Sequence, residues 1–313
     1  MELHDFCSTS RVAIVAGKGG VGKTTVTAAL GTAAARAGMS VLIVEVEGKS
    51  GLSAALGCPP LTYEEQEVSP GLRARTLTPD EALLEYLEDR GLRRVSKQLV
   101  KSGALDVVAT AVPGMKDILV LGKVKQLEQS RAADLILIDA PAAGHAITFL
   151  LSARGMIDAV RVGPVRKQAE DVIALLSDPA RCRVMLVTLP EETPVNELVE
   201  TAFALEDRVG IKLAPVVING VPDDLALVGA ITAQDAAAAG IGSPAEQRAL
   251  DAAASFRHER HELAGAQCER LRSLFPLPQL CLPFVFDTIG PAAIDRLATT
   301  LTDEIVNLPG SAL

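Results

Sequence analysis

Aromatic residues are scarce in this chain of 313 residues, where they make up 3% of the sequence and tryptophan is absent. Hydrophobic residues still make up 49%, so we expect a core built mostly from Val, Leu, Ile and Ala. Positive charge is also in short supply, because the net charge is −9 and the Lys and Arg residues are scattered. Since phosphate backbones are bound by clustered Lys and Arg, this balance argues against a nucleic-acid partner.

Long apolar runs and paired cysteines are missing as well. No apolar run reaches the ~20 residues that span a bilayer, and the acidic N-terminus lacks the character of a signal peptide. We therefore expect a cytoplasmic protein with no direct membrane insertion. The five cysteines are far apart and include no C-x-x-C pair. This excludes the usual spacing of zinc and iron–sulfur sites and favours reduced thiols.

One glycine-rich stretch, residues 17–24, carries the clearest chemistry. It reads G-K-G-G-V-G-K-T and fits the phosphate-binding pattern G-x-x-x-x-G-K-[ST]. A short apolar run precedes it at residues 12–16, and an alanine-rich run without proline follows at residues 25–37. The order of strand, glycine loop and helix is the context in which this motif binds phosphates.

The motif assigns roles to its residues. Lys23 is expected to reach the β- and γ-phosphates, and the Thr24 hydroxyl is expected to ligate Mg²⁺. The glycines let successive N–H groups converge on the phosphates in front of a helix N-terminus. We expect ATP or ADP to contact the following loop residues: Gly19, Gly20, Val21, Gly22, Lys23, Thr24 and Thr25.

A second lysine, Lys18, directly follows the first glycine of the loop. A simple phosphate loop does not need it, and its side chain is better placed to project outward than to touch its own γ-phosphate. A projecting lysine can complete the site of another subunit, as an arginine finger does in trans. We therefore predict a catalytic role for Lys18, with a solvated surface lysine as the alternative.

Buried strands that alternate with helical patterns predict an α/β fold, a doubly wound and mainly parallel sheet with helices on both faces. We treat residues 1–313 as one domain of the phosphate-loop NTPase kind. A helical subdomain is expected within it at about residues 78–130, and a second helical segment at about residues 223–275. The expected strands cover residues 12–16, 41–46, 72–77, 135–139, 184–189, 215–219 and 280–286.

Acidic side chains stand at the ends of two expected strands. Ligands in this fold bind beyond the carboxyl ends of the strands, so Glu45 and Glu47 are expected to face the nucleotide. We choose Glu47 to position or deprotonate the attacking water, with a helix-cap or ion-pair carboxylate as the alternative. Asp139 ends the strand at residues 135–139 and is expected to hold Mg²⁺ through a bound water.

Residues at two later strand ends are candidates for contacting the base. Asn219 ends the strand at residues 215–219, where its amide can read adenine with both a donor and an acceptor. The alternative for Asn219 is an ordinary turn residue. Pro283 and Phe284, in the strand expected at residues 280–286, are further candidate nucleotide contacts.

One segment of the expected insertion, residues 105–121, is unusually apolar. It reads L-D-V-V-A-T-A-V-P-G-M-K-D-I-L-V-L. Such a run covers a core, lines a dimer contact or binds an apolar client, and packing in a core or a dimer is the default.

These motifs resemble a known class of proteins. The loop with its extra lysine is similar to the deviant phosphate loop of the SIMIBI class, which includes arsenite-pump ATPases, tail-anchored-protein targeting ATPases, MinD and ParA-type ATPases and nitrogenase iron protein. Three further runs resemble the arsenite-pump and guided-entry branch: G-L-S-A-A-L-G, D-A-P-A-A-G-H-A-I-T-F-L and V-T-L-P-E-E-T-P-V-N-E. The resemblance covers most of the chain, and the insertion matches only loosely.

The resemblance implies a dimer, or a fused pseudo-dimer, that closes around ATP. The lysine matching Lys18 reaches across the interface in that branch, the carboxylate matching Glu47 activates water, and the Asn matching Asn219 contacts adenine. This chain departs from the branch at residues 46–50, which read V-E-G-K-S where the branch has T-D-P-x-H. The added methylene of Glu47 is expected to slow hydrolysis, and the missing proline suggests a looser switch.

Other departures concern the cargo. The dimer-zinc C-x-x-C and the arsenite-binding cysteine cluster of the branch are absent, and the insertion contains Met115 as its single methionine. These differences argue against metalloid transport and against tail-anchor targeting. The leading hypothesis is a Mg²⁺-dependent ATPase whose homodimer or paralogue heterodimer handles a protein client, an anion or a membrane partner. The alternatives are a slow ATP-binding regulatory module and an arsenite-pump ATPase.

Overall fold

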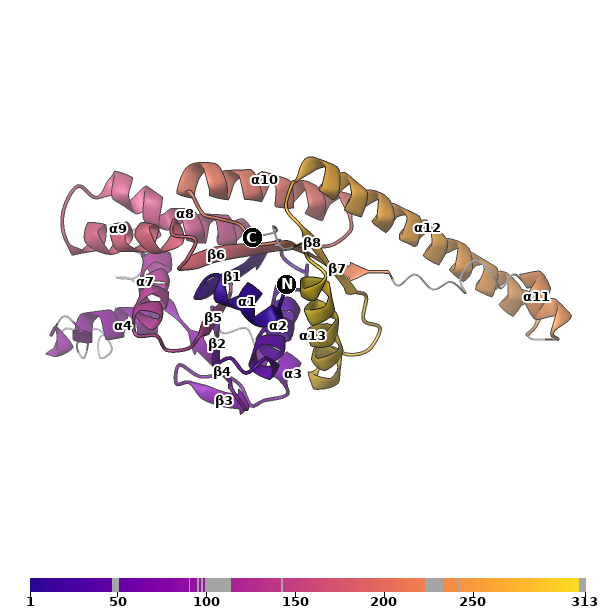
Figure 1. Cartoon of the computed structure of the whole chain (residues 1–313), viewed down its shortest axis with the longest axis horizontal. Helices are drawn as coiled ribbons and strands as arrows, with labels where there is room; N and C mark the ends of the chain where they lie inside the picture. Colours follow the sequence, from indigo (N-terminus) through magenta and orange to yellow (C-terminus); the bar gives the residue numbers. More distant parts are fainter. Residues whose placement is uncertain are drawn as a thin grey trace.

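The computed structural model describes residues 1–46, 51–89, 91–94, 96, 98, 114–141, 143–222, 233–240 and 242–309. Its centre is an eight-stranded sheet in the order β3-β4-β2-β5-β1-β6-β7-β8 (Figure 1). The strands are β1 (Val12–Gly17), β2 (Val41–Val46), β3 (Gln66–Ser69), β4 (Leu72–Leu77), β5 (Leu135–Asp139), β6 (Cys182–Thr188), β7 (Val216–Val221) and β8 (Gln279–Pro283).

The helices alternate with these strands along the chain. They are α1 (Leu3–Ser8), α2 (Lys23–Arg36), α3 (Gly51–Leu56), α4 (Pro79–Asp89), α7 (Met115–Gln129), α8 (Ala143–Ala159), α9 (Pro164–Leu176), α10 (Glu192–Val209), α11 (Ala233–Ala238), α12 (Pro244–Leu274) and α13 (Pro291–Val306). This alternation is what buries both faces of a parallel sheet.

The central strands run parallel and are covered on both faces. All residues of β2 and β5 are buried, as expected for strands rich in Val, Leu and Ile between two helical layers. The register pairs Val15 with Asp139 and Glu45 with Asp139. The carboxyl ends of β1, β2 and β5 therefore end at the same edge of the sheet, where a ligand site is expected.

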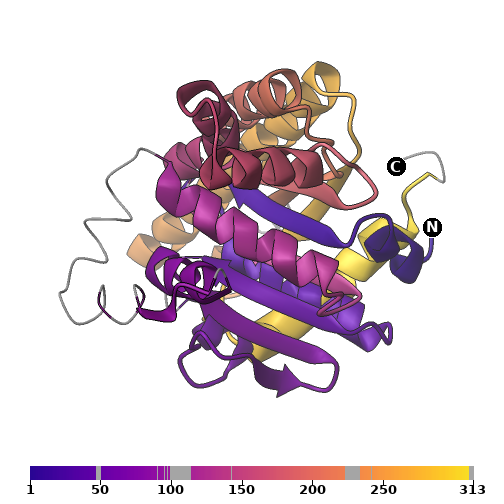
Figure 2. The same cartoon turned by 90° about the vertical axis from the view of Figure 1, so that its left-hand side faces the viewer.

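Two helical layers complete the core. One apolar cluster joins α2 and α13 to the sheet, and another joins α7, α8, α9 and α10 to its opposite face. Figure 2 shows α7 crossing the sheet on this second face. Small residues let α2 approach the strands closely, since a Cβ added at Gly31 would lie 2.8 Å from Cδ1 of Ile43.

The predicted fold class is confirmed, with corrections in detail. The last strand ends at Pro283 instead of residue 286, and β3 pairs antiparallel with β4 as an edge that the sequence did not predict. The apolar segment at residues 105–121 lies partly outside the described residues. Its residues 118–121 are buried in the core, so this half serves packing. The proposed subdomain boundaries stay predictions.

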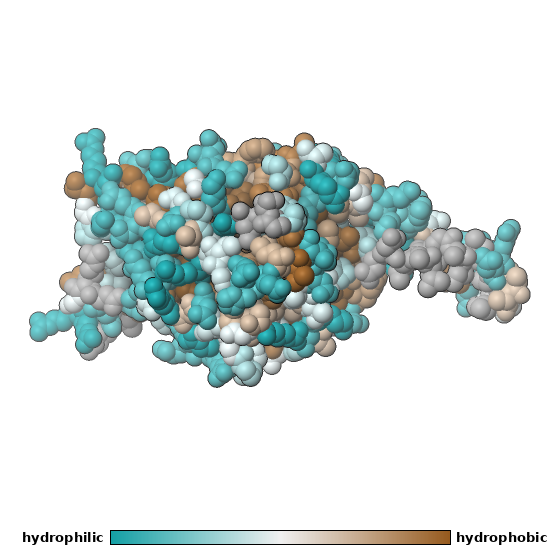
Figure 3. Space-filling model, viewed as in Figure 1, coloured by the Kyte–Doolittle hydropathy of each residue, from teal (hydrophilic) through white to brown (hydrophobic). Residues whose placement is uncertain are grey.

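The longest helix, α12, leaves the main body of the molecule. It begins with a capping box in which the Ser243 side chain accepts a hydrogen bond from the N–H of Glu246, and the Glu246 side chain accepts one from the N–H of Ser243. Figure 1 shows α12 projecting away from the sheet with α11 at its far end. The space-filling view of the same side shows mainly hydrophilic surface with smaller apolar areas (Figure 3). Within the described residues, no helix has the length and apolarity needed to cross a membrane.

Candidate functional site

The phosphate loop connects β1 to α2, as predicted. Gly22 is the N-cap of α2 and has a φ of 90°, a backbone conformation that favours glycine. A Cβ at Gly22 would also lie 2.2 Å from Nδ2 of Asn219, and one at Gly17 would lie 2.3 Å from the carbonyl oxygen of Val187. A larger residue at Gly17 would meet the backbone of β6, and one at Gly22 would displace the Asn219 side chain. The N-cap Gly22 has no side chain that could accept a hydrogen bond from the first turn of α2, and helix N-termini of this kind are suited to binding anions.

Lys23 and Thr24 open α2 at the carboxyl edge of the sheet. Lys23 is buried, and its Nζ donates a hydrogen bond to the carbonyl oxygen of Lys18 at 2.9 Å. The Thr24 hydroxyl donates to Oδ2 of Asp139 at 2.7 Å. The hydroxyl of Thr27, one turn further along α2, lies 3.5 Å from Oδ1 of Asp139. The helix start and the end of β5 are therefore held together by hydroxyl–carboxylate contacts.

The pair formed by Thr24 and Asp139 suits a hard divalent cation. Magnesium prefers oxygen ligands and is usually held by one or two protein groups together with waters and substrate phosphates. A hydroxyl next to a buried carboxylate at a helix N-terminus provides that donor set. The residues present therefore fit Mg²⁺.

Glu45 is the second buried carboxylate at this edge. Its Oε1 accepts a hydrogen bond from the N–H of Leu52 at 3.3 Å, and its Oε2 accepts one from the Thr76 hydroxyl at 3.4 Å. These contacts tie β2 to α3 and β4. Glu47, the predicted water-positioning residue, lies outside the described residues. The chain resumes at Gly51, where an added Cβ would lie 3.6 Å from Cγ2 of Thr24, so the start of α3 borders the loop.

Lys18 has a partner within its own chain. Its Nζ forms an ion pair with Oε1 of Glu197 on α10, and the two side chains are 41% and 39% exposed. The other oxygen, Oε2 of Glu197, is buried and finds no hydrogen-bond partner among the described residues. In this conformation Lys18 is turned toward α10 of the same subunit. The sequence alone does not connect Glu197 with Lys18, because 179 residues separate the two.

Asn219 contacts the phosphate loop directly. Its Nδ2 donates a hydrogen bond to the carbonyl oxygen of Val21 at 2.9 Å. Pro283 ends the neighbouring strand β8, and the N–H of Phe284 donates to the carbonyl oxygen of Val221 at 2.8 Å. The candidate base contacts thus flank the loop on the side of β7 and β8.

A cavity of about 260 Å³ opens on this side of the loop. The Phe284 and Phe286 rings meet edge to face with centroids 4.9 Å apart, and the Arg257 guanidinium lies 5.6 Å from the centre of the Phe286 ring. The complete lining consists of Gly220, Pro222, Phe256, Arg257, Arg260, Phe284 and Phe286. Aromatic rings beside arginines offer flat surfaces on which a nucleobase can stack. Three of these residues come from α12, which the sequence analysis did not connect with the site.

Comparison with known proteins agrees with this geometry. A family model described as "Anion-transporting ATPase" matches residues 10–161. The chain is also 30% identical over 325 residues to the ATPase BagA of Mycobacterium tuberculosis, an alignment that covers 94% of this chain and 93% of that protein. The chain belongs to the anion-transporting ATPase family. Family membership and the phosphate loop together make it an ATP hydrolase.

Other members of the anion-transporting ATPase family align over shorter stretches. The ATPase get3 of Schizosaccharomyces japonicus is 30% identical over 139 residues, which cover 44% of this chain and 42% of that protein. The arsenical pump-driving ATPase of Escherichia coli is 27% identical over 234 residues, covering 66% of this chain and 38% of that protein. The resemblance suggested by the sequence motifs is confirmed at the level of the family.

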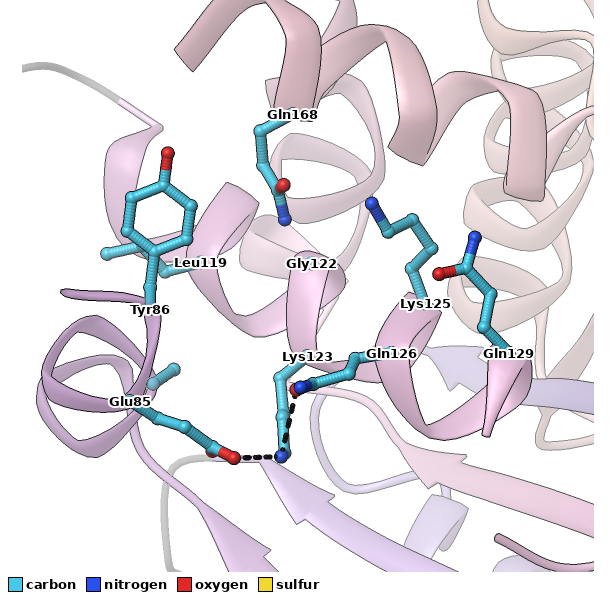
Figure 4. Close-up of a pocket in the computed structure, with 10 residues that line it drawn as sticks. Glu85, Tyr86, Leu119, Gly122, Lys123, Lys125, Gln126, Gln129 and Gln168 are labelled. Atoms are coloured by element: carbon cyan, nitrogen blue, oxygen red, sulfur yellow. Dashed lines mark hydrogen bonds and ion pairs between the residues drawn. The ribbon is translucent and has the colours of Figure 1, made fainter. Parts of the chain in front are cut away.

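This family member has a second cavity, of about 180 Å³, lined by α4, α7 and α9 (Figure 4). Lys123 forms an ion pair with Glu85 and donates to Oε1 of Gln126 at 3.0 Å. Burial raises the pKa of Glu85, but hydrogen bonds from Lys123 and Tyr63 outweigh it and hold that pKa below its usual value. The groove between these helices is therefore lined mainly by charged and amide side chains.

Proposed function

We propose that the chain is a Mg²⁺-dependent ATPase with a deviant phosphate loop, working as a nucleotide-switched dimer that acts on a protein client or an anion. The observation that carries this proposal is a contact between the start of α2 and the end of β5. There the Thr24 hydroxyl lies 2.7 Å from Oδ2 of Asp139, beside the buried Lys23. This arrangement supports binding of a nucleoside triphosphate with its metal ion.

Each residue has a role in the proposed cycle. Loop N–H groups and Lys23 bind the β- and γ-phosphates, and Glu47 orients or deprotonates the attacking water. Thr24 would hold Mg²⁺ directly and Asp139 would hold it through water, and the ion would supply positive charge next to the phosphates. Lys18 stabilises charge in the site of the other subunit. The contacts to adenine come from the following residues: Asn219, Pro283 and Phe284.

The dimer is proposed to be formed either by two copies of this chain or with a paralogue, and its client is a protein, an anion or a membrane partner. A second candidate function is a slow ATP-binding regulatory module. It is favoured by the ion pair that holds Lys18 against Glu197 of the same subunit, because a lysine bound in cis is not available in trans. Arsenite pumping is the weakest proposal, since the cysteines are far apart in sequence.

Two measurements test these proposals. ATP binding is measured by calorimetry for the wild type, for Lys23→Ala and for the exposed control Lys167→Ala on α9. Lys23→Ala is expected to abolish binding and the control to preserve it, and retained affinity in Lys23→Ala would show that the loop is not the site. Single-turnover hydrolysis then compares the wild type with Glu47→Gln. A large loss supports the ATPase cycle, whereas equally slow turnover in both supports the regulatory module.

A further inference from the structure

Within the described part of the chain, the residues of α12 before Ala264 pack little against the main body, apart from Arg257 beside the Phe286 ring and Arg260 beside Glu191. Of the 31 residues of α12, the first buried one is Ala264. None of the side chains from Pro244 to Leu263 is buried, and α11 packs only near the far end (Figure 1). Large apolar side chains are nevertheless exposed along this part, namely Leu250, Phe256 and Leu263.

Packing, not propensity, provides most of the stability of a helix in a protein. Isolated helices are only marginally stable in water, because nucleation is unfavourable and each added turn contributes little. The capping box at Ser243 helps the helix to begin but stabilises it by only about 1 kcal/mol. A long helix with exposed apolar residues therefore indicates that another surface covers it.

The exposed residues of this part form a regular seam. Apolar side chains recur at intervals of four and three residues, which place them on one face of the helix. The seam contains Ala245, Ala249, Ala252, Phe256 and Leu263, and Glu259 occupies the remaining position. All six positions are exposed. Such spacing is the pattern by which two helices interlock in a coiled coil.

We propose that this seam binds the same seam of a second copy of the chain, with the two helices antiparallel and the two-fold axis at Ala254. In this register Ala252 faces Phe256 of the second copy, and Ala245 faces its Leu263. Each large side chain is thus opposed by a small one, so the seam keeps an even width. A parallel arrangement in register would instead place Phe256 against Phe256 and Ala252 against Ala252.

Charges beside the seam agree with this register. The antiparallel pair brings Arg248 next to Glu262 of the second copy, and Glu246 next to Arg260 of the second copy. Both pairs have opposite signs, and each occurs twice because of the two-fold symmetry. Within one chain Arg260 contacts Glu191 at 3.4 Å and Glu262 contacts His258 at 3.3 Å. These are exposed contacts that exchange at little cost.

No seam residue belongs to the phosphate loop, so this association does not need a nucleotide. Phe256 also lines the cavity beside the loop, and it is the seam residue that the two sites share. It goes beyond the proposed function and gives the chain a second contact between subunits besides the one that Lys18 would make. The two can fail independently, because removing ATP abolishes only the contact through the loop.

The first test measures mass by sedimentation without nucleotide over a range of protein concentrations. The wild type is expected to dimerise. Arg248→Glu places two carboxylates next to each other at both ends of the seam and is expected to weaken the dimer by about tenfold. Adding Glu262→Arg to the same chain restores opposite charges and is expected to restore the dimer. Circular dichroism and ATP turnover, expected to be unchanged, show that each variant is folded.

The second test is a disulfide cross-link near the two-fold axis. Ala253 lies beside the seam, next to Ala253 of the second copy. Ala253→Cys is therefore expected to give a cross-linked dimer on oxidation. Asp251→Cys, on the outer side of the same turn, is the matched control and is expected to stay monomeric on a denaturing gel. No native cysteine lies between residues 242 and 263. A wild type that is monomeric at every concentration overturns the proposal. So does a dimer that Arg248→Glu does not weaken and that Ala253→Cys does not cross-link.

Discussion

Replacing Glu197 by Gln tests whether the ion pair with Lys18 restrains the enzyme. Lys18 cannot serve the site of another subunit while its Nζ is bound to Glu197 of its own chain. The proposed cycle therefore includes a step in which Lys18 exchanges this carboxylate for a phosphate. Glu197→Gln removes the negative charge and keeps the size of the side chain, so it should make that exchange easier.

The size of the effect follows from the exposure of the pair. Both side chains are about two-fifths exposed, and ion pairs of this kind stabilise by about 0–1 kcal/mol. An energy of about 1 kcal/mol corresponds to about fivefold in an equilibrium constant. A homodimer releases two such pairs, so its ATP-dependent dissociation constant is expected to fall by about thirtyfold at most. Because exposed charges are screened by salt, the difference should shrink at high ionic strength.

Dimerisation is measured by light scattering in ADP and in ATP with Mg²⁺. Steady-state hydrolysis is measured in ATP with Mg²⁺. The matched control is Glu200→Gln, which makes the same charge change on an exposed residue of α10 and is expected to behave as the wild type. The reasoning is refuted if Glu197→Gln weakens the ATP-dependent dimer or slows hydrolysis. That result would show that Glu197 orients Lys18 for its task instead of restraining it.

Three further predictions concern the loop, the core and the polar groove. Gly22→Ala places a Cβ against the Asn219 amide in a backbone conformation unsuited to alanine, so calorimetry should show at least a tenfold loss of ATP affinity. Glu128, whose side chain is 2% exposed, binds two arginines, and Glu128→Ala should lower the free energy of unfolding by about 3 kcal/mol in urea titration. The lowered pKa of Glu85 means that its stabilising effect is present at pH 7 and is lost as the pH falls through that pKa. The stability difference between wild type and Glu85→Gln should therefore disappear in acid.

Each of these predictions has a contrary outcome. Unchanged affinity in Gly22→Ala would mean that the loop rearranges to admit a side chain. A loss below about 1 kcal/mol in Glu128→Ala would show that its arginine partners regain full hydration. A difference between wild type and Glu85→Gln that persists at pH 2 would assign the effect to packing instead of charge.

Much of the fold was predictable because each central strand is a continuous apolar run. Val41–Val46 and Leu135–Asp139 are buried on both faces and could be recognised without tertiary information. The short edge strand β3 could not be recognised, since its residues alternate in exposure over only four positions. It exists because β4 offers it a hydrogen-bonding edge.

The candidate site was predictable to the extent that it is local in sequence. The loop motif places Lys23 and Thr24, and a strand that ends in an acid places Asp139. Two contacts that hold the loop could not be predicted, because each joins residues more than 170 positions apart: the ion pair of Glu197 with Lys18 and the hydrogen bond from Asn219 to Val21. Glu47 lies outside the described residues, so its role stays a prediction.

The two edges of the sheet determine how the folded chain can associate with others. At one edge, β3 has four residues and an irregular register opposite β4. At the other edge, β8 ends in Pro283, which has no N–H, and the N–H of Cys281 is donated to Glu304 at 2.8 Å. Short, irregular or blocked edges resist the addition of a foreign strand. Among the described strands, neither border is thus a good template for fibril-like growth, which leaves helical surfaces to bring subunits together.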